Sequence, residues 1–323
     1  MAQRALGAFE RPVDYLFVIG RSLRNRCAVL PEELAALAVS DANANGPQSW
    51  RLCNQLGGGH QSGAWRLESD RRQVAVLKLA TPSWAQQMIR AERAVAKVRA
   101  AGYPTPAWLA TGQTNGIGYQ IQEFVQGTEV AVIGIAEAAE LIKVLELQAG
   151  LDPDPDRCWS DYLANQLKAG LDALRADVAL TGAPGRDLIL ACNQLLATTD
   201  PDACLLRTDM VHGDFRHSNV LLDHGTVSGV IDIEAIGSGS RVNDYATLLD
   251  HTDIEPDALE LLINAAVEAA GPDALRACFA LVAMDLVRFM YSRSPALDVR
   301  PLANRIVALT DRAKTLDRIT RTK

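Results

Sequence analysis

The feature of this sequence that most constrains its fold is a change of pattern near Gly127. Before it, the chain is made of short segments with strand-forming composition, separated by turn residues. These segments are 51–56, 64–68, 73–79, 107–111 and 119–124. After Gly127, Ala and Leu recur with the helical period. The pattern predicts an α+β fold, with a small, five-stranded antiparallel sheet followed by a larger, mainly helical part.

Two helices are predicted in the amino-terminal part. The first begins at Pro31, which stands at a favourable first helical position and is followed by two acids. The second runs from about Pro82 to Ala101 and interrupts the strands, with Thr81 as its cap. One helix therefore precedes the predicted sheet and one lies within it.

The same patterns divide the chain into three parts. We predict a helical extension over residues 1–49, an amino-terminal lobe over 50–124 and a carboxy-terminal lobe over 125–323. The last part contains one strand-like segment, 210–233, with a His224-Gly225 turn in its middle. A length of 323 residues suits two lobes better than one core.

Charge is distributed unevenly along the chain. Residues 1–127 contain 14 Lys and Arg against 9 Asp and Glu, a charge of +5, while residues 128–323 contain 18 against 30, a charge of −12. The net charge of −7 lacks the basic footprint of a nucleic-acid-binding protein. The first part favours an anionic ligand and the second a cationic one.

Nothing in the sequence predicts a membrane or an oxidising compartment. The six cysteines are scattered and form no C-x-x-C pair, which is typical of reduced thiols. The short apolar run 15–19 does not fit a signal peptide, and Asp285 and Arg288 interrupt the apolar segment 281–290. We expect a cytoplasmic protein with no membrane partner.

The most informative motif is segment 211–222, Val-His-Gly-Asp-Phe-Arg-His-Ser-Asn-Val-Leu-Leu. Asp214 is followed five residues later by Asn219, and an apolar strand follows. This spacing can aim a carboxylate at a substrate hydroxyl while the amide oxygen ligates Mg²⁺. A capped turn is the alternative for so short a pattern.

A second acid stands at the end of the next apolar strand. Asp232 follows Val230-Ile231 on the far side of the predicted hairpin turn, which would bring it beside Asn219. Magnesium prefers one or two carboxylates together with waters and phosphate oxygens. The pair predicts a site for Mg²⁺ and a nucleotide; a buried Asp satisfied by backbone amides is the alternative.

With these motifs the chain resembles the aminoglycoside phosphotransferase and choline kinase family, which has a bilobal, protein-kinase-like fold. The resemblance covers about residues 50 to 250. It implies that Asp214 is the catalytic carboxylate, that Asn219 and Asp232 are metal ligands and that Glu234 assists at the metal. It also implies that Asp244 braces the catalytic loop.

The amino-terminal lobe adds a candidate phosphate clamp. Gly58, Gly59 and Ser62 lie in a glycine-rich turn where backbone N–H groups can approach phosphate oxygens; an ordinary hairpin turn is the alternative. Lys78 ends Val-Ala-Val-Leu-Lys, which resembles the kinase strand whose lysine reaches the α- and β-phosphates. Glu92, fourteen residues on, is expected to pair with Lys78. A surface position is the alternative for Glu92.

Segment 122–127 resembles the hinge of a kinase. Backbone groups of Glu123 and Val125 would there bind adenine. Arg216 stands where protein kinases often have a phosphate-contacting lysine, so we expect it to neutralise the transferring phosphoryl group; a surface charge is the alternative. No activation segment follows Asp232, which favours a small-molecule acceptor over a protein.

The acceptor is predicted from acids of the carboxy-terminal lobe. Segment 244–260 carries six acids, Asp250 and Asp253 among them, and no Lys or Arg. Asp285 lies in an apolar run, where an unpaired charge is costly, so Arg288 or a substrate ammonium is its expected partner. With Glu234, these acids suggest a polycationic acceptor such as an aminoglycoside, although a solvated helix face explains them equally well.

Together these observations predict an ATP-dependent phosphotransferase that requires Mg²⁺, with GTP as a possible donor. A macrolide kinase and a metabolic kinase for choline, homoserine or a sugar are alternatives, as is a nucleotide-binding pseudokinase. A Rossmann dehydrogenase is disfavoured, because the glycines lie between antiparallel strands rather than before a helix.

Overall fold

A five-stranded antiparallel sheet forms the first part of the fold. The computed structural model describes residues 31–56, 64–197, 199–293 and 299–321. The strands pair in the order β1-β2-β3-β5-β4, and every neighbouring pair is antiparallel, as the sequence predicts. They are β1 (Trp50–Leu56), β2 (Ala64–Ser69), β3 (Val74–Ala80), β4 (Trp108–Thr114) and β5 (Ile117–Glu123).

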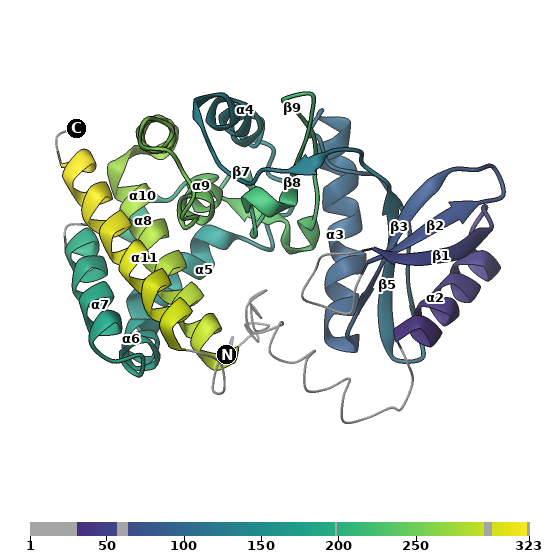
Figure 1. The fold of residues 1–323 in the computed structure, drawn as a ribbon, viewed down its shortest axis with the longest axis horizontal. Coiled ribbons are helices and arrows are strands. Elements are labelled where there is room, and N and C mark those ends of the chain that lie inside the picture. Colours follow the sequence, from purple (N-terminus) through teal and green to yellow (C-terminus); the bar gives the residue numbers. More distant parts are fainter. Residues whose placement is uncertain (1–30, 57–63, 198, 294–298, 322–323) are drawn as a thin grey trace, which may run out of the picture.

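Two helices accompany this sheet. Helix α2 (Pro31–Asn45) buries Ala35, Ala38 and Val39 in one cluster with strand residues such as Leu77, so it shares the core of the sheet. Helix α3 (Pro82–Ala100) lies between the sheet and the rest of the molecule (Figure 1). The predicted helices beginning at Pro31 and Pro82 are confirmed.

The rest of the chain is mainly helical, which confirms the α+β fold. Its helices are α4 (Ile135–Glu146), α5 (Trp159–Asn165), α6 (Leu171–Ala179), α7 (Ala183–Leu196), α8 (Pro201–Cys204), α9 (Val242–Leu249), α10 (Pro256–Arg293) and α11 (Val299–Thr320). Helix α10 is interrupted at Ala270 and Gly271, just before Pro272, because proline cannot continue the hydrogen bonding of a helix.

Two small sheets lie where the two parts of the molecule meet (Figure 1). The predicted strand-like segment forms β7 (Asp209–Val211), β8 (Val220–Asp223) and β9 (Thr226–Val230), with the expected turn at His224-Gly225 between the last two. Strand β8 also pairs with β6 (Thr128–Glu129), and β7 pairs with β10 (Gly237–Gly239). These short strands fix the ends of the loops that carry the polar motifs.

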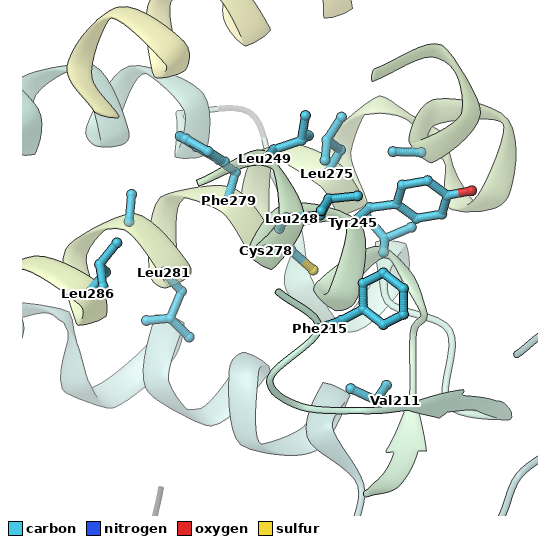
Figure 2. Packing of buried hydrophobic residues seen from close by; sticks show 14 of the residues in the cluster. Val211, Phe215, Tyr245, Leu248, Leu249, Leu275, Cys278, Phe279, Leu281 and Leu286 are labelled. Carbon is cyan, nitrogen blue, oxygen red and sulfur yellow. The ribbon is translucent and has the colours of Figure 1, made fainter. Parts of the chain in front are cut away.

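A continuous apolar core supports the segment around Asp214. Phe215 and Val211 are fully buried and lie among Tyr245 of α9 and Leu275 and Phe279 of α10 (Figure 2). Burying an aromatic side chain of this kind contributes about 2 kcal/mol. Phe215, directly after Asp214, therefore anchors the loop to helices α9 and α10.

No helix in the described part of the chain is long and apolar enough to cross a membrane. Five cysteines fall within the described ranges, and all five are free thiols: Cys53, Cys158, Cys192, Cys204 and Cys278.

Candidate active site

The loop between β7 and β8 holds Asp214 in a defined position. Its Oδ1 accepts a hydrogen bond from Nε of Arg216 at 2.7 Å. Its backbone oxygen accepts one from Nδ2 of Asn219 at 2.9 Å. The Asp214 side chain is 40% exposed, so the carboxylate remains accessible from solvent. The loop thus presents an oriented, ionisable acid.

The buried carboxylate of Asp244 holds this loop in place through hydrogen bonds. Asp244 of α9 accepts hydrogen bonds from the backbone N–H groups of His212, at 2.6 Å, and Gly213, at 3.0 Å. Nε2 of Gln148 donates a third, at 3.0 Å. Burial raises the pKa of Asp244 to about 6, although these hydrogen bonds lower it. The position of Asp244 agrees with the bracing role that the family resemblance implies.

Gly213 allows a close approach that no other residue would permit. It has φ of +85°, and a Cβ added there would lie 2.5 Å from the ring of Trp159. The indole N–H of Trp159 donates to the carbonyl of Ala235 at 3.1 Å. One tryptophan therefore supports both the loop of Asp214 and the turn that follows Asp232.

Asn219 and Asp232 lie at the same end of the β8–β9 hairpin, where the backbone N–H of Ile231 donates to the carbonyl of Asn219 at 2.8 Å. Nδ2 of Asn219 is used within the loop, which leaves its Oδ1 for a ligand. Asp232 adopts the left-handed conformation with φ of +61°, and its side chain is 45% exposed. Two oxygen donors at one edge fit the preference of Mg²⁺.

Lys78 of β3 lies beside Asp232 and Glu234. Its Nζ donates to Oδ1 of Asp232 and, at 2.8 Å, to Oε1 of Glu234. Burial lowers the pKa of Lys78, but the two carboxylates outweigh it and raise the pKa above its usual range. The structure thus brings Lys78, Asp232 and Glu234 together although more than 150 residues separate them in sequence.

The expected ion pair between Lys78 and Glu92 is wrong for this structure. Glu92 lies on the side of α3 that faces β4, where it accepts a hydrogen bond from Oγ1 of Thr111 at 2.7 Å. The face of α3 turned toward the metal motif carries Gln87, whose Nε2 donates to the carbonyl of Glu234 at 2.8 Å. Glu234 therefore takes the place beside Lys78.

Helix α3 also makes a second connection to the same segment. Arg90 donates to the carbonyl of Ile236 at 2.7 Å and forms an ion pair with Asp154. Gln87 and Arg90 were not predicted from the sequence, because polar residues on a helix are usually solvated. The contact of Trp159 with the loop between β7 and β8 was not predicted either. No pattern in the sequence distinguishes these three residues.

The hinge residues lie at the end of β5. The backbone N–H of Glu123 donates to the carbonyl of Ala107, whereas the N–H of Val125 has no partner in the described chain. The side chain of Glu123 accepts from the N–H of Ala107 at 2.9 Å.

Gly58, Gly59 and Ser62 lie outside the described residues, so their predicted role in phosphate binding stays a prediction.

The expected acceptor acids are not equally available. Asp250 lies between two arginines: its Oδ2 is 3.0 Å from NH1 of Arg216, and its Oδ1 is 2.9 Å from NH2 of Arg305. Asp285 forms an ion pair with Arg288 at 3.4 Å. Asp253 is exposed and accepts a hydrogen bond from Thr252. The carboxylates of Asp250 and Asp285 are thus already paired within the chain.

A small β-sheet lobe packs on a helical lobe. Lys78 meets an Asp–x–Glu turn that lies next to an Asp–x₄–Asn loop. This arrangement defines the class of kinase-like phosphotransferases. Residues 53–278 match the model of the phosphotransferase enzyme family, APH. The chain belongs to this family and is a small-molecule kinase. Curated protein sequences include no significant match to it.

Solved structures of phosphotransferases share this fold. The aminoglycoside phosphotransferase APH(4)-Ia has a TM-score of 0.59 at 18% identity, over 88% of this chain and 98% of that one. The macrolide 2′-phosphotransferase MphH from Brachybacterium faecium has a TM-score of 0.54 at 16% identity, over 84% and 97%. An aminoglycoside phosphotransferase from Alicyclobacillus acidocaldarius has a TM-score of 0.59 at 13% identity, over 93% and 97%.

Proposed function

We propose that this chain transfers the γ-phosphoryl group of ATP to a hydroxyl group of a small polycationic molecule. An aminoglycoside-type antibiotic is the first candidate acceptor, and its inactivation is the biological result. The observation that carries the proposal is the meeting of Lys78 with Asp232 and Glu234 beside the loop of Asp214 and Asn219. These groups suit a reaction that depends on positioning and charge neutralisation.

The proposed reaction uses Asp214 at the acceptor. The acceptor oxygen forms a bond to the γ-phosphorus, the bond from phosphorus to the β–γ bridging oxygen breaks, and ADP leaves. Asp214 orients the hydroxyl and takes its proton. Oδ1 of Asp214 accepts from Arg216 at 2.7 Å, whereas Oδ2 accepts a longer hydrogen bond from Asn219 at 3.4 Å, so Oδ2 is the oxygen that we assign to the hydroxyl. Arg216 is placed to offset negative charge on the phosphoryl group.

The nucleotide is assigned to the region between the lobes. Lys78 would bind the α- and β-phosphates, and the unpaired N–H of Val125 is available to adenine. ATP is the proposed donor and GTP the alternative. Variants of APH(4)-Ia were crystallised with ADP or AMP-PNP, which supports a nucleotide site in this fold.

Asn219 and Asp232 would hold Mg²⁺, with Glu234 beside them. When bound, the ion would neutralise charge on the phosphate oxygens. The protein's own contribution is to keep two oxygen donors at one edge of the β8–β9 hairpin, which the hydrogen bond from Ile231 to Asn219 supports.

A polycationic acceptor is supported by charge and by the relatives. Residues 128–323 carry a charge of −12. Two APH(4)-Ia variants were crystallised with hygromycin B. Among the expected acceptor acids Asp250, Asp253 and Asp285, Asp253 alone forms no ion pair with a described residue, so its carboxylate is the one we assign to an acceptor ammonium group.

An acceptor with fewer positive charges is the second candidate. Its support is the pairing of Asp250 with two arginines and of Asp285 with Arg288, which removes two of the expected cation-binding acids. Macrolides, choline, homoserine and sugars belong to this group.

The test is release of ADP measured with aminoglycosides, cationic peptide antibiotics, macrolides, choline and homoserine, each with and without EDTA. We expect one acceptor class to raise ADP release at least a hundredfold and EDTA to abolish the increase. Asp214→Ala should remove transfer and leave ATP binding within about threefold. Binding of ATP without stimulation by any acceptor would indicate a pseudokinase and would reject the proposal.

A further inference from the structure

Three arginines converge on the end of α9. Arg216 and Arg305 each pair with Asp250, and NH2 of Arg312 donates to the carbonyl of His251 at 3.3 Å. Arg305 and Arg312 both belong to α11, where a spacing of seven residues places them on one face. This region is connected to the catalytic loop, because Arg216 also binds Asp214.

The three arginines outnumber the two carboxylates that pair with them. Asp250, with a 3% exposed side chain, serves Arg216 and Arg305, and Arg216 also pairs with Asp214. Arg312 forms no ion pair with any described acid, and its NH1 is buried without a hydrogen-bond partner. Burial and the neighbouring Arg305 lower the pKa of Arg312 to about 10, although Asp250 opposes the change, so Arg312 stays charged at neutral pH. A buried, unpaired guanidinium is costly unless an anion accompanies it.

A histidine beside Arg312 has a second unused group. His251 is 9% exposed, and its Nε2 is buried with no hydrogen-bond partner. Its ring stacks on that of His217 with centroids 3.4 Å apart. Burial lowers the pKa of His251, although a hydrogen bond to the backbone of Ala131 and the nearby Asp253 oppose the change. Because the ring donates a hydrogen bond to the backbone of Ala131, Nε2 of the neutral ring is an acceptor without a partner.

We propose that Arg312 and Arg305, beside His251, form a binding site for an anionic group, a carboxylate or a phosphate, next to the catalytic loop. A guanidinium offers planar paired donors that match either group. The exposed carboxylate of Asp253 does not serve as this partner, since it makes no ion pair with the described arginines.

Two sources provide such an anion: the acceptor or its phosphorylated product, and free phosphate. The existence of the site goes beyond the proposed function and does not depend on it. Only its assignment to the acceptor rests on that function. An acceptor bound here would carry an anionic group as well as the hydroxyl that receives phosphate.

The first experiment measures thermal unfolding of the full chain against inorganic phosphate. Arg312→Gln removes the unpaired charge, and Arg318→Gln is the matched control, because Arg318 is an exposed residue of the same helix. We expect phosphate to raise the melting temperature of the wild type and of Arg318→Gln, and to raise that of Arg312→Gln much less. Without phosphate, Arg312→Gln should melt at or above the wild-type temperature.

Two results would overturn the proposal. An equal response of Arg312→Gln and wild type to phosphate would indicate binding elsewhere. A lower melting temperature of Arg312→Gln in anion-free buffer, with an unchanged phosphate response, would indicate that Arg312 is only structural.

The second experiment identifies the source. If the anion belongs to the acceptor, Arg312→Gln should raise the acceptor KM about tenfold with the KM for ATP unchanged, since a charge-assisted hydrogen bond is lost. Inorganic phosphate should then compete with the acceptor. If free phosphate is the ligand, the acceptor KM stays the same while the melting difference remains. Absence of any transfer would reject the proposed function alone, because the phosphate titration does not require turnover.

Discussion

Nζ of Lys78 lies 2.8 Å from Oε1 of Glu234, so the lysine of the sheet is paired with an acid from the other lobe. In the arrangement expected from protein kinases the partner would be Glu92 of the intervening helix. Here α3 contributes Gln87, which binds the backbone of Glu234. The position of Lys78 is therefore set by the turn that follows Asp232.

This arrangement predicts unequal effects at the two glutamates. Glu234→Gln should lower kcat by about tenfold to a hundredfold, because a displacement of Lys78 by about 1 Å is enough for such a loss. Glu92→Gln should reduce kcat less than threefold, since Glu92 contacts Thr111. Steady-state ADP release for the two variants is the measurement, and the reverse order of effects would restore Glu92 as the partner.

Gly213 should not tolerate even alanine. A Cβ there would overlap the ring of Trp159 at 2.5 Å and would require a strained positive φ. We expect Gly213→Ala to lose at least a hundredfold in turnover. Gly225→Ala is the matched control, with φ of +80° and no atom within 4 Å of the added Cβ, and it should cost only about 1 kcal/mol of stability. Similar activities of the two variants would contradict the role of the Trp159 contact.

Asp250 should be required for stability. Asp250→Asn leaves Arg216 and Arg305 near each other without their shared carboxylate, and removing one partner of a buried ion pair typically costs about 3–5 kcal/mol. Asp257→Asn, at an exposed position of α10, should change the free energy of unfolding by less than about 0.5 kcal/mol. Denaturant unfolding at pH 7 compares them. A stable Asp250→Asn protein that binds its acceptor poorly would instead support the original assignment of Asp250 to the acceptor.

Asp244 predicts a specific pH dependence. Its pKa is about 6 in the folded chain and 3.8 in a model compound, so between these values the folded state binds more protons than the unfolded state. The unfolding free energy should therefore fall as pH rises from about 4 to 6, by roughly 3 kcal/mol from this group. Asp244→Asn does not titrate and should lack this component. Parallel curves of unfolding free energy against pH for the two proteins would contradict the assignment of this component to Asp244.

Much of the fold was predictable because its signals are local. The five strands, the helix after Thr81 and the turn at His224-Gly225 each depend on the pattern of a few neighbouring residues. The motif around Asp214 and the acid at Asp232 were predictable for the same reason. Their placement at one hairpin follows from the short distance between them in the chain.

The remaining contacts were not predictable because they join residues far apart in sequence. The partners of Asp250 come from a loop 34 residues earlier and a helix 55 residues later. The acidic segment therefore appeared free of basic partners when only its own residues were considered. Glu92 lies fourteen residues after Lys78 within the predicted helix, as expected of its partner, but the rotation of α3 about its axis depends on packing against β4 and β5, which a single sequence does not define.

The contact between Arg305 and Asp250 also has a consequence for the synthesis of the chain. Asp250 emerges from the ribosome 55 residues before Arg305, an interval of about 3 to 11 s at typical rates of translation. During that time the loop of Asp214 already has its full sequence, but Asp250 has only Arg216 as a partner. The Asp214 loop thus gains this full set of contacts only once α11 has been synthesised, and a ribosome that pauses before α11 would expose a chain with an incompletely supported catalytic loop to cellular quality control.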